Sequence, residues 1–210
     1  MMRVLLTDIE VRVMGVLVEK ARTTPEYYPL TLNALVAGCN QKSNRDPVVA
    51  YDDALASAAL DSLRGKSLVL KVTGAGERVP KYRQYFAEAF GLSPAQEAVI
   101  CELMLRGAQT AGELRNRAER MHHFAHLAEV EEVVEALLTA AEGPLVARLP
   151  RQAGQKEVRY AHLLTGEVSI PDLPAVPDDQ LGRLEVEVAA LRQELDALRT
   201  EFLAFKSQLE

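Results

Sequence analysis

The chain has 210 residues, of which 48% are hydrophobic and 5% aromatic, and it contains no tryptophan. This length exceeds that of one small domain, and cores built from Leu, Val and Ala are typical of helical modules. No run of about 18 apolar residues is present, which excludes a membrane span. The N-terminus carries Asp8 and Glu10 and lacks the basic-then-apolar pattern of a secretory signal, so we expect a cytoplasmic protein.

The formal net charge of −6 is unevenly distributed along the chain. Residues 1–90 have a net charge of +2, residues 91–166 a net charge of −2, and residues 167–210 a net charge of −6. The charge of the whole chain therefore equals that of its last segment, while the rest is close to neutral. Any argument about nucleic-acid binding must be made element by element.

The first 90 residues predict three helices and a hairpin. Apolar spacing predicts a helix from Thr7 to Ala21, in which Thr7 and Glu10 have the spacing of a capping box. Two amphipathic helices and two β-prone segments follow, at Thr31–Cys39, Tyr51–Arg64, Leu68–Thr73 and Arg78–Phe86. A polar turn ended by Pro47 joins the two helices, and Gly74-Ala75-Gly76 joins the strands. This order predicts a winged-helix domain at residues 1–90.

The same order of elements repeats in residues 91–166, which predicts a second winged-helix domain. The predicted helices are Ser93–Arg106, Thr110–Met121 and Ala128–Glu142, and the predicted strands are Leu145–Leu149 and Val158–Leu164. The predicted fold class is therefore mainly α with small β-hairpins, an α+β protein with two tandem winged-helix domains.

The C-terminal segment predicts a linker and a coiled coil. Residues 167–180 contain three prolines and several acids, which is typical of a stiff linker. In residues 181–210, apolar residues recur in alternating steps of three and four, as in a heptad seam: Leu181, Leu184, Val188, Leu191, Leu195, Leu198, Phe202, Phe205 and Leu209. Flanking acids face flanking bases in a parallel homodimer: Glu187, Glu194 and Glu201 against Arg192, Arg199 and Lys206. We expect such a dimer; the alternative is a helix packed on the chain's own body.

The segment CNQKSNRDP at residues 39–47 stands out as a motif. With YPLTLNAL before it and RGAQTAGELRNRAERM later, it resembles the YceH-like family of uncharacterised bacterial proteins. The resemblance covers roughly residues 5–168 and implies a tandem winged-helix fold, without an established activity. The chain departs from this family at residues 121–126, MHHFAH, where relatives lack the histidines.

The cations of the chain do not lie on the helices that usually enter a DNA groove. The third helix of each predicted domain is acidic overall, whereas each hairpin region has a net charge of +3. We therefore expect DNA to be bound by the inter-helix turn and the first wing, with these candidate residues: Gln41, Lys42, Asn44, Arg45, Lys71, Arg78, Lys81 and Arg83. The alternative to DNA contact by the turn is a structural role, in which Arg45 pairs with Asp46 or Asp52. The alternative for the wings is that each is simply a solvated hairpin.

Two other classes of function are weighed against DNA binding. A protein-interaction adaptor would use the acidic helix at Ala128–Glu142 together with the coiled coil. An enzyme would need a reactive site, and His122, His123 and His126 have a spacing that metal ligands can adopt. Histidines between surface helices are ordinary, and the chain has no phosphate loop, nucleophile elbow or zinc signature. We therefore predict no catalytic residue, metal or cofactor, and buried reduced thiols at Cys39 and Cys101.

Overall fold

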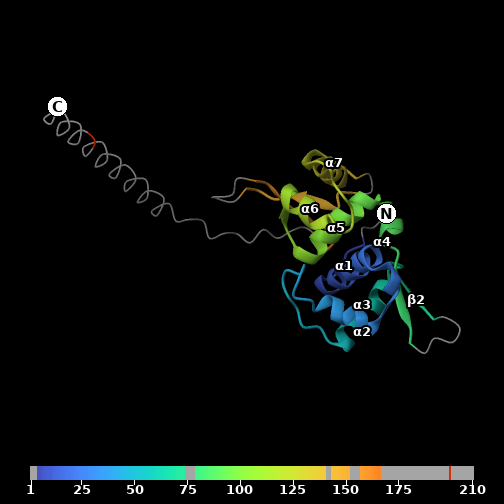
Figure 1. The fold of residues 1–210 in the computed structure, drawn as a ribbon. Helices are drawn as coiled ribbons and strands as arrows, with labels where there is room; N and C mark the ends of the chain where they lie inside the picture. Colours follow the sequence, from blue (N-terminus) through green and yellow to red (C-terminus); the bar gives the residue numbers. More distant parts are fainter. Residues whose placement is uncertain (1–3, 74–78, 141–142, 152–156, 167–198, 200–210) are drawn as a thin grey trace, which may run out of the picture. The chain divides into compact units, whose positions relative to one another are not determined.

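The computed structural model describes residues 4–73, 79–140, 143–151, 157–166 and Arg199 (Figure 1). Contacts divide the chain into two units, residues 1–168 and 169–210. Of the second unit only Arg199 is described, so the predicted linker and heptad seam lie outside the described residues.

The first repeat is a helical layer covered by a small sheet. Its helices are α1 (Asp8–Thr23), α2 (Leu32–Cys39) and α3 (Asp53–Gly65), with a 3-10 turn at Pro25–Tyr27. Its strands are β1 (Leu30–Thr31), β2 (Val69–Val72) and β3 (Lys81–Gln84), in the antiparallel order β1-β3-β2. The predicted helices and hairpin are confirmed within a few residues, whereas β1 was not predicted.

The second repeat has the same topology. After the short α4 (Phe86–Phe90) come α5 (Pro94–Arg106), β4 (Gln109–Thr110), α6 (Ala111–Ala118), α7 (Leu127–Leu138), β5 (Val146–Arg148) and β6 (Arg159–His162). The strand order is β4-β6-β5, which matches that of the first sheet. The described residues thus form a mixed α+β unit of seven α-helices and two three-stranded antiparallel sheets. None of the described helices is long and apolar enough to cross a bilayer.

Two predicted helix ends are wrong: the helix predicted to end at Glu142 ends at Leu138, and the helix predicted to end at Met121 ends at Ala118. After Ala118 the backbone tightens into a turn, in which the amides of Met121 and His122 both donate to the Ala118 carbonyl, at 2.7 and 2.9 Å. The loop that follows is held by Arg115, whose guanidinium donates to the carbonyls of Phe124 and Ala125. Arg115 therefore holds the residues just before α7 against α6.

The predicted capping box at α1 is confirmed. The amide of Glu10 donates to Thr7 Oγ1 at 3.3 Å, and the Thr7 amide donates to Glu10 Oε2 at 2.6 Å. The same device starts α5, through Ser93 and Gln96, and α6, through Thr110 and Glu113. Each cap satisfies amides that the helix leaves unpaired, which typically stabilises a protein by about 1 kcal/mol.

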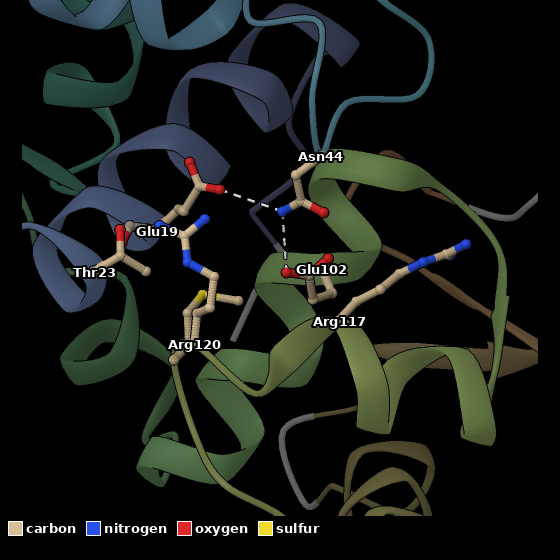
Figure 2. Close-up of a pocket in the computed structure, with 7 residues that line it drawn as sticks. Glu19, Thr23, Asn44, Glu102, Arg117 and Arg120 are labelled. Carbon is tan, nitrogen blue, oxygen red and sulfur yellow. Dashed lines mark hydrogen bonds between the residues drawn. The ribbon is translucent and has the colours of Figure 1, made fainter.

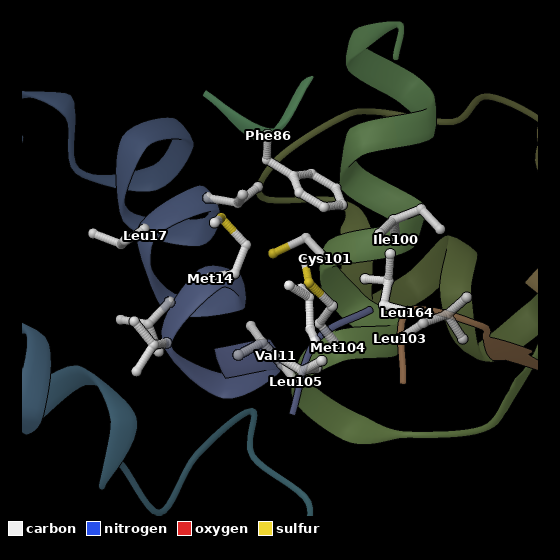
Figure 3. Close-up of a cluster of buried hydrophobic side chains, with 14 of the residues drawn as sticks. Val11, Met14, Leu17, Phe86, Ile100, Cys101, Leu103, Met104, Leu105 and Leu164 are labelled. Atoms are coloured by element: carbon white, nitrogen blue, oxygen red, sulfur yellow. The ribbon is translucent and has the colours of Figure 1, made fainter. Parts of the chain in front are cut away.

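The hydrophobic core is shared by the two repeats, with α1 and α5 at its centre. In α1 every residue from Val11 to Glu19 is buried, and in α5 every residue from Glu97 to Leu105. Helices buried all round lie inside a core, whereas a surface helix buries one stripe. Figure 3 shows their side chains meeting around Met14 and Cys101. The Cys101 thiol donates to the carbonyl of Gly15 at 3.3 Å, so the two helix backbones approach closely there.

Gly15 provides a test of this close approach. A Cβ at this position would lie 2.9 Å from Leu105 Cδ2 and 3.2 Å from Met104 Cβ. We expect Gly15→Ala to lower the free energy of unfolding by about 1–3 kcal/mol, because overpacking forces neighbouring side chains to shift. Gly65→Ala is the matched control, since a Cβ there has no atom within 4 Å. Denaturant unfolding measures both variants; equal stabilities would contradict the close packing of α1 on α5.

Candidate functional site

The polar turn between α2 and α3 is folded inward around Arg45. The side chain of Arg45 is 0% exposed, and its Nη2 donates to Glu19 Oε2 at 2.6 Å. Its Nε donates to the carbonyl of Gly38 at 3.0 Å. The ion pair is therefore made with α1 and not with Asp46 or Asp52, the partners that the structural alternative named. A guanidinium in this position reaches no phosphate unless the turn opens.

Asn44 connects the two repeats. Its φ of 54° lies in the left-handed region, which Asn adopts more readily than most residues. Its Nδ2 donates to Glu19 Oε1 on α1 and to Glu102 Oε1 on α5, at 3.2 Å each (Figure 2). The Asp46 amide adds a bond of 3.0 Å to the carbonyl of Leu105. Residues 40–47 therefore fasten the first repeat to α5 of the second. This segment lies within the first repeat, between α2 and α3, and is called the inter-repeat turn because it contacts both repeats.

The two ends of the inter-repeat turn are also fixed. Asn40 Nδ2 donates to the carbonyl of Tyr51, and the Tyr51 amide donates back to Asn40 Oδ1, both at 2.8 Å. The guanidinium of Arg12, buried in α1, donates to the Pro47 carbonyl at 2.7 Å. These bonds satisfy backbone groups of a loop that has no regular secondary structure of its own.

The other turn candidates lie nearer the surface. Gln41 is half-buried, and its Oε1 accepts from Arg45 at 3.1 Å and from Lys20 at 3.4 Å. Lys42 is exposed and has no partner among the described residues. Of the four turn residues predicted to contact DNA, Lys42 is therefore the exposed one.

The segment RGAQTAGELRNRAERM, at residues 106–121, forms a similar network of hydrogen bonds and ion pairs in the second repeat. Gln109 is fully buried; its Nε2 donates to the Glu102 carbonyl at 2.9 Å, and its Oε1 accepts from Arg117 at 2.8 Å. The Glu113 carboxylate forms ion pairs with the guanidinium groups of Arg117, at 3.2 Å, and Arg159, at 2.9 Å. These contacts tie α6 to α5 and to β6. Arg159, which contributes to the charge of the second hairpin, is thus engaged in an internal pair.

A polar pocket of about 220 Å³ lies beside the inter-repeat turn (Figure 2). It is lined by residues from α1, the turn, α5, α6 and the segment after α6: Glu19, Thr23, Asn44, Glu102, Arg117, Arg120 and Met121. Glu19, Glu102 and Arg120 are not among the site residues predicted from the sequence. The sequence does contain a signal for a buried carboxylate at Glu19 and Glu102, because each interrupts an apolar stretch of a helix that is otherwise suited to full burial.

The two carboxylates of the pocket are held in different states. Burial raises the pKa of Glu102 to about 7, helped by the nearby charge of Glu19 and partly offset by the Asn44 hydrogen bond and nearby arginines. Burial also opposes ionisation of Glu19, but the hydrogen bonds and charge of Arg45 bring its pKa below the ordinary value. Glu102 Oε2 has no hydrogen-bond partner among the described residues. The pocket thus contains one neutralised carboxylate and one unsatisfied carboxyl oxygen.

The first hairpin places two candidate cations on one face. In the register of β2 and β3, Leu70 lies opposite Arg83 and Val72 opposite Lys81. Directly opposite residues share a face of a sheet, so these four side chains lie together. Leu70 is 47% exposed and Arg83 is exposed, which shows that this face points outward. The Arg83 guanidinium lies 5.3 Å from the ring centroid of Tyr85.

The other hairpin candidates are placed differently. Lys71 is exposed but lies opposite Tyr82, which is buried, so it belongs to the opposite face of the hairpin. Arg78 lies outside the described residues. In the second hairpin Arg148 approaches Glu135 at 3.7 Å and Arg151 is exposed, while Lys156 is not described.

The surfaces of α3 and α7 are anionic, as the sequence indicated. On α3, Asp53 and Asp61 are exposed, and Arg64 pairs with Asp61 at 2.8 Å. On α7, Glu131 and Glu132 are exposed and have no ion pair with a described residue. Neither helix presents a cationic face to a phosphate backbone.

The histidines between α6 and α7 lie apart. His122 packs edge-on against Phe124, with ring centroids 4.7 Å apart, and His123 Nδ1 lies 2.6 Å from Glu119 Oε1. His126 is the N-cap residue of α7. In the described parts of the chain, His, Cys, Asp and Glu side chains form no group of three that could hold a metal.

Both thiols are buried and reduced, as predicted. Burial raises the pKa of Cys39 to about 12 and that of Cys101 well above its ordinary value. Because the thiolate is the reactive form, neither cysteine is a candidate nucleophile.

Comparison with known proteins identifies the family. Residues 6–155 match the family described as "Protein of unknown function, DUF480". A UPF0502 protein of Pelobacter propionicus is 51% identical over 221 residues, covering 100% of both chains. UPF0502 protein GSU0233 of Geobacter sulfurreducens is 50% identical with the same coverage, and a UPF0502 protein of Opitutus terrae is 53% identical over 89% of this chain and 83% of its own. The chain belongs to this DUF480/UPF0502 family, to which the YceH-like resemblance corresponds.

Removing the buried cation tests the role of the inter-repeat turn. We expect Arg45→Met to lower the free energy of unfolding by about 3–5 kcal/mol, because Glu19 is left buried without its partner. The double variant Glu19→Gln/Arg45→Met should recover part of the loss. Lys42→Met is the matched control, since Lys42 is exposed in the same turn. Urea unfolding decides: a loss no larger than that of the control would contradict a structural role for Arg45.

The raised pKa of Glu102 predicts how stability depends on pH. Between its ordinary value of 4.5 and about 7, the folded chain keeps a proton that the unfolded chain loses, so the stability contributed by this group falls as pH rises through that window. Glu102→Gln removes this dependence. From pH 5 to pH 8, we expect stability to shift in favour of the variant by roughly 2–3 kcal/mol. Glu19 titrates in both proteins and cancels in the comparison; parallel pH profiles in urea unfolding would refute the shift.

Proposed function

We propose that this protein is a tandem winged-helix DNA-binding protein whose first wing makes the main contact. The order of elements supports the fold, since three helices and a hairpin recur in both repeats with one strand order. In a winged helix the third helix and the wing are the usual DNA contacts. In this chain the first hairpin region has a net positive charge, whereas the third helix of each repeat has an acidic surface.

The observation that carries the proposal is the outward face of the first hairpin. Lys81 and Arg83 lie on this face with the exposed Leu70, and Lys71 is exposed on the other side. Cations that flank an exposed ridge suit a phosphate backbone, while the acidic surfaces of α3 and α7 disfavour groove insertion. We therefore assign α3 a supporting role and the wing the contact.

The proposed direct DNA contacts are fewer than the eight candidate residues predicted from the sequence. Arg45, Asn44 and Gln41 are engaged inside the inter-repeat turn, so their contribution to DNA binding is indirect, through the shape of the turn. The proposed direct contacts are Lys42, Lys71, Lys81 and Arg83, together with Arg78, which lies outside the described residues. The binding is therefore expected to depend on phosphates more than on base sequence.

Titration with duplex DNA in graded salt tests the proposal. We expect full-length protein to bind at low salt, and Lys81→Ala/Arg83→Ala to bind more weakly on every sequence, with a salt slope reduced by about one for each lost phosphate contact. Arg120→Ala is the control, because Arg120 is an exposed cation outside both hairpins. The absence of binding at low salt would exclude the function.

The proposed DNA-binding form is a parallel coiled-coil dimer, formed by residues 181–210. A dimer would double the number of phosphate contacts made by each complex. Sedimentation analysis of the full chain should give a dimer, and Leu191→Asp/Leu195→Asp should give a monomer, because two charges in the seam are costly to bury. A monomeric parent chain would refute this part of the proposal.

The acidic helix α7 favours one alternative, a protein-interaction adaptor. Glu131 and Glu132 are exposed on it, and Leu127 at its start is 43% exposed. Such a surface suits a basic protein partner. If purified protein carries no nucleic acid, and a co-purified protein is lost on Glu131→Lys/Glu132→Lys, the adaptor replaces DNA binding as the function.

A further inference from the structure

The first hairpin is tied at its base to the second repeat. Gln84 is the last residue of β3, and its Nε2 donates to Glu97 Oε1 on α5 at 3.3 Å. Its Oε1 accepts from the amide of Phe86, where α4 begins, and its own amide donates to the Tyr28 hydroxyl at 2.6 Å. Gln84 therefore connects the end of the strand, the start of α4 and the first turn of α5.

Glu97 is a buried carboxylate whose charge is balanced from the first repeat. It is 2% exposed, and its Oε2 accepts from the guanidinium of Arg22 on α1, with the Nε at 2.7 Å. Its place in the first turn of α5 adds the favourable interaction of a carboxylate with the helix dipole. Because Arg22 engages Oε2, Oε1 is left for Gln84. One carboxylate of the second repeat thus holds both α1 and β3 of the first.

The second hairpin has no equivalent tie among the described residues. The two sheets have one strand order, and in each the central strand places a tyrosine, Tyr82 or Tyr160, opposite the short first strand. Two residues further along, Gln84 and His162 therefore occupy equivalent positions. His162 is half-buried, and its Nδ1 has no hydrogen-bond partner among the described residues. The fold can thus form without this tie, which indicates that the tie serves the first hairpin in particular.

The tied hairpin is also the one with an exposed arginine next to the tie. Arg83 is exposed, whereas the equivalent residue of the second hairpin, Ala161, is 7% exposed and carries no charge. Pairing with β1 fixes β3 within the first repeat, while the bond from Gln84 to Glu97 relates it to the second. Because Arg83 directly precedes Gln84, a shift of Gln84 also moves the backbone that carries this guanidinium.

We propose that Glu97 is a positioning residue for the DNA contact of the first hairpin. Acting from the second repeat through Gln84, it holds Arg83 in the orientation that meets the phosphates, without touching DNA itself. This role rests on the DNA contact proposed above for the hairpin. It gives the second repeat a part in DNA binding that the acidic surface of α7 cannot supply.

Gln84→Met tests the tie, because it removes the hydrogen bonds of the side-chain amide and leaves the Arg22–Glu97 pair intact. His162→Met is the matched control, since it places the same side chain at the equivalent position of the second hairpin. In titrations of the full-length protein with duplex DNA, we expect Gln84→Met to bind at least about threefold more weakly than the control. A hairpin that is correctly oriented for only part of the time lowers the apparent affinity by that fraction.

The salt dependence of binding separates positioning from contact. The slope should be unchanged in Gln84→Met, because the bound form still makes the same phosphate contacts. Arg83→Ala removes a phosphate contact and should lower the slope by about one.

Limited proteolysis tests the tie without DNA. Trypsin cleavage after Lys81, in the central strand β3, reports opening of the first hairpin, whereas cleavage after Lys20, inside α1, reports unfolding of the whole unit. We expect Gln84→Met to speed cleavage after Lys81 at least about threefold relative to cleavage after Lys20, since cleavage follows the population of the open form. A general loss of stability would raise both rates together.

An exchange of the two side-chain groups supplies a rescue. Gln84→Glu places a second carboxylate beside Glu97 Oε1, so repulsion should loosen the hairpin by the proteolysis measure. The double variant Gln84→Glu/Glu97→Gln restores one amide and one carboxylate at the tie, together with the net charge of the parent chain. It should return cleavage after Lys81 to within about twofold of the parent rate, as expected for two groups that act on each other.

Three results would overturn the role of Glu97. In the first, Gln84→Met and His162→Met are alike in DNA affinity and in cleavage. In the second, Gln84→Met lowers the salt slope as Arg83→Ala does, which would make Gln84 itself a phosphate contact. In the third, the double variant is cleaved as fast as Gln84→Glu. If the parent chain binds no DNA, the proposed function fails separately, and the trypsin comparison alone decides whether Glu97 holds the hairpin.

Discussion

The structure depends on one buried ion pair, that between Arg45 and Glu19. A guanidinium with no exposed surface requires a carboxylate and further acceptors, and here Glu19 and the Gly38 carbonyl supply them. This pair determines the shape of the inter-repeat turn, which in turn holds Asn44 between the carboxylates of α1 and α5. Replacing such a pair with apolar residues can leave stability unchanged, so its main contribution is to define one arrangement of the turn.

The ion pair also decides which cations remain for a partner. Arg45 and Arg159 balance buried or half-buried carboxylates, and Arg12 satisfies backbone carbonyls. Of the exposed cations described in the first repeat, Arg22 and Arg64 pair with Glu97 and Asp61, whereas Lys42 and the hairpin residues Lys71 and Arg83 form no ion pair with a described residue. The surfaces of α3 and α7 are acidic. The proposed DNA contact is therefore assigned to the wing and not to the third helix.

Glu19 and Glu102 show how the same residue type acquires two states in one pocket. Both stand in helices at the centre of the core, and burial opposes ionisation of both. Arg45 neutralises Glu19. For Glu102, the effect of burial is only partly offset by the Asn44 amide and nearby arginines, so the pKa of Glu102 rises to about 7.

The sequence by itself determined the helices, the hairpins and their repetition, because apolar spacing, Thr7–Glu10 capping and turn residues act over a few neighbours. The two-residue strands β1 and β4 and the five-residue α4 were missed, since they are too short to carry a periodic pattern. Arg45 and Glu19 are 26 residues apart, and Asn44 and Glu102 are 58 apart. Only tertiary packing brings these groups together, that of α2 on α1 for the first pair and that of α1 on α5 for the second, and no rule of local spacing connects them.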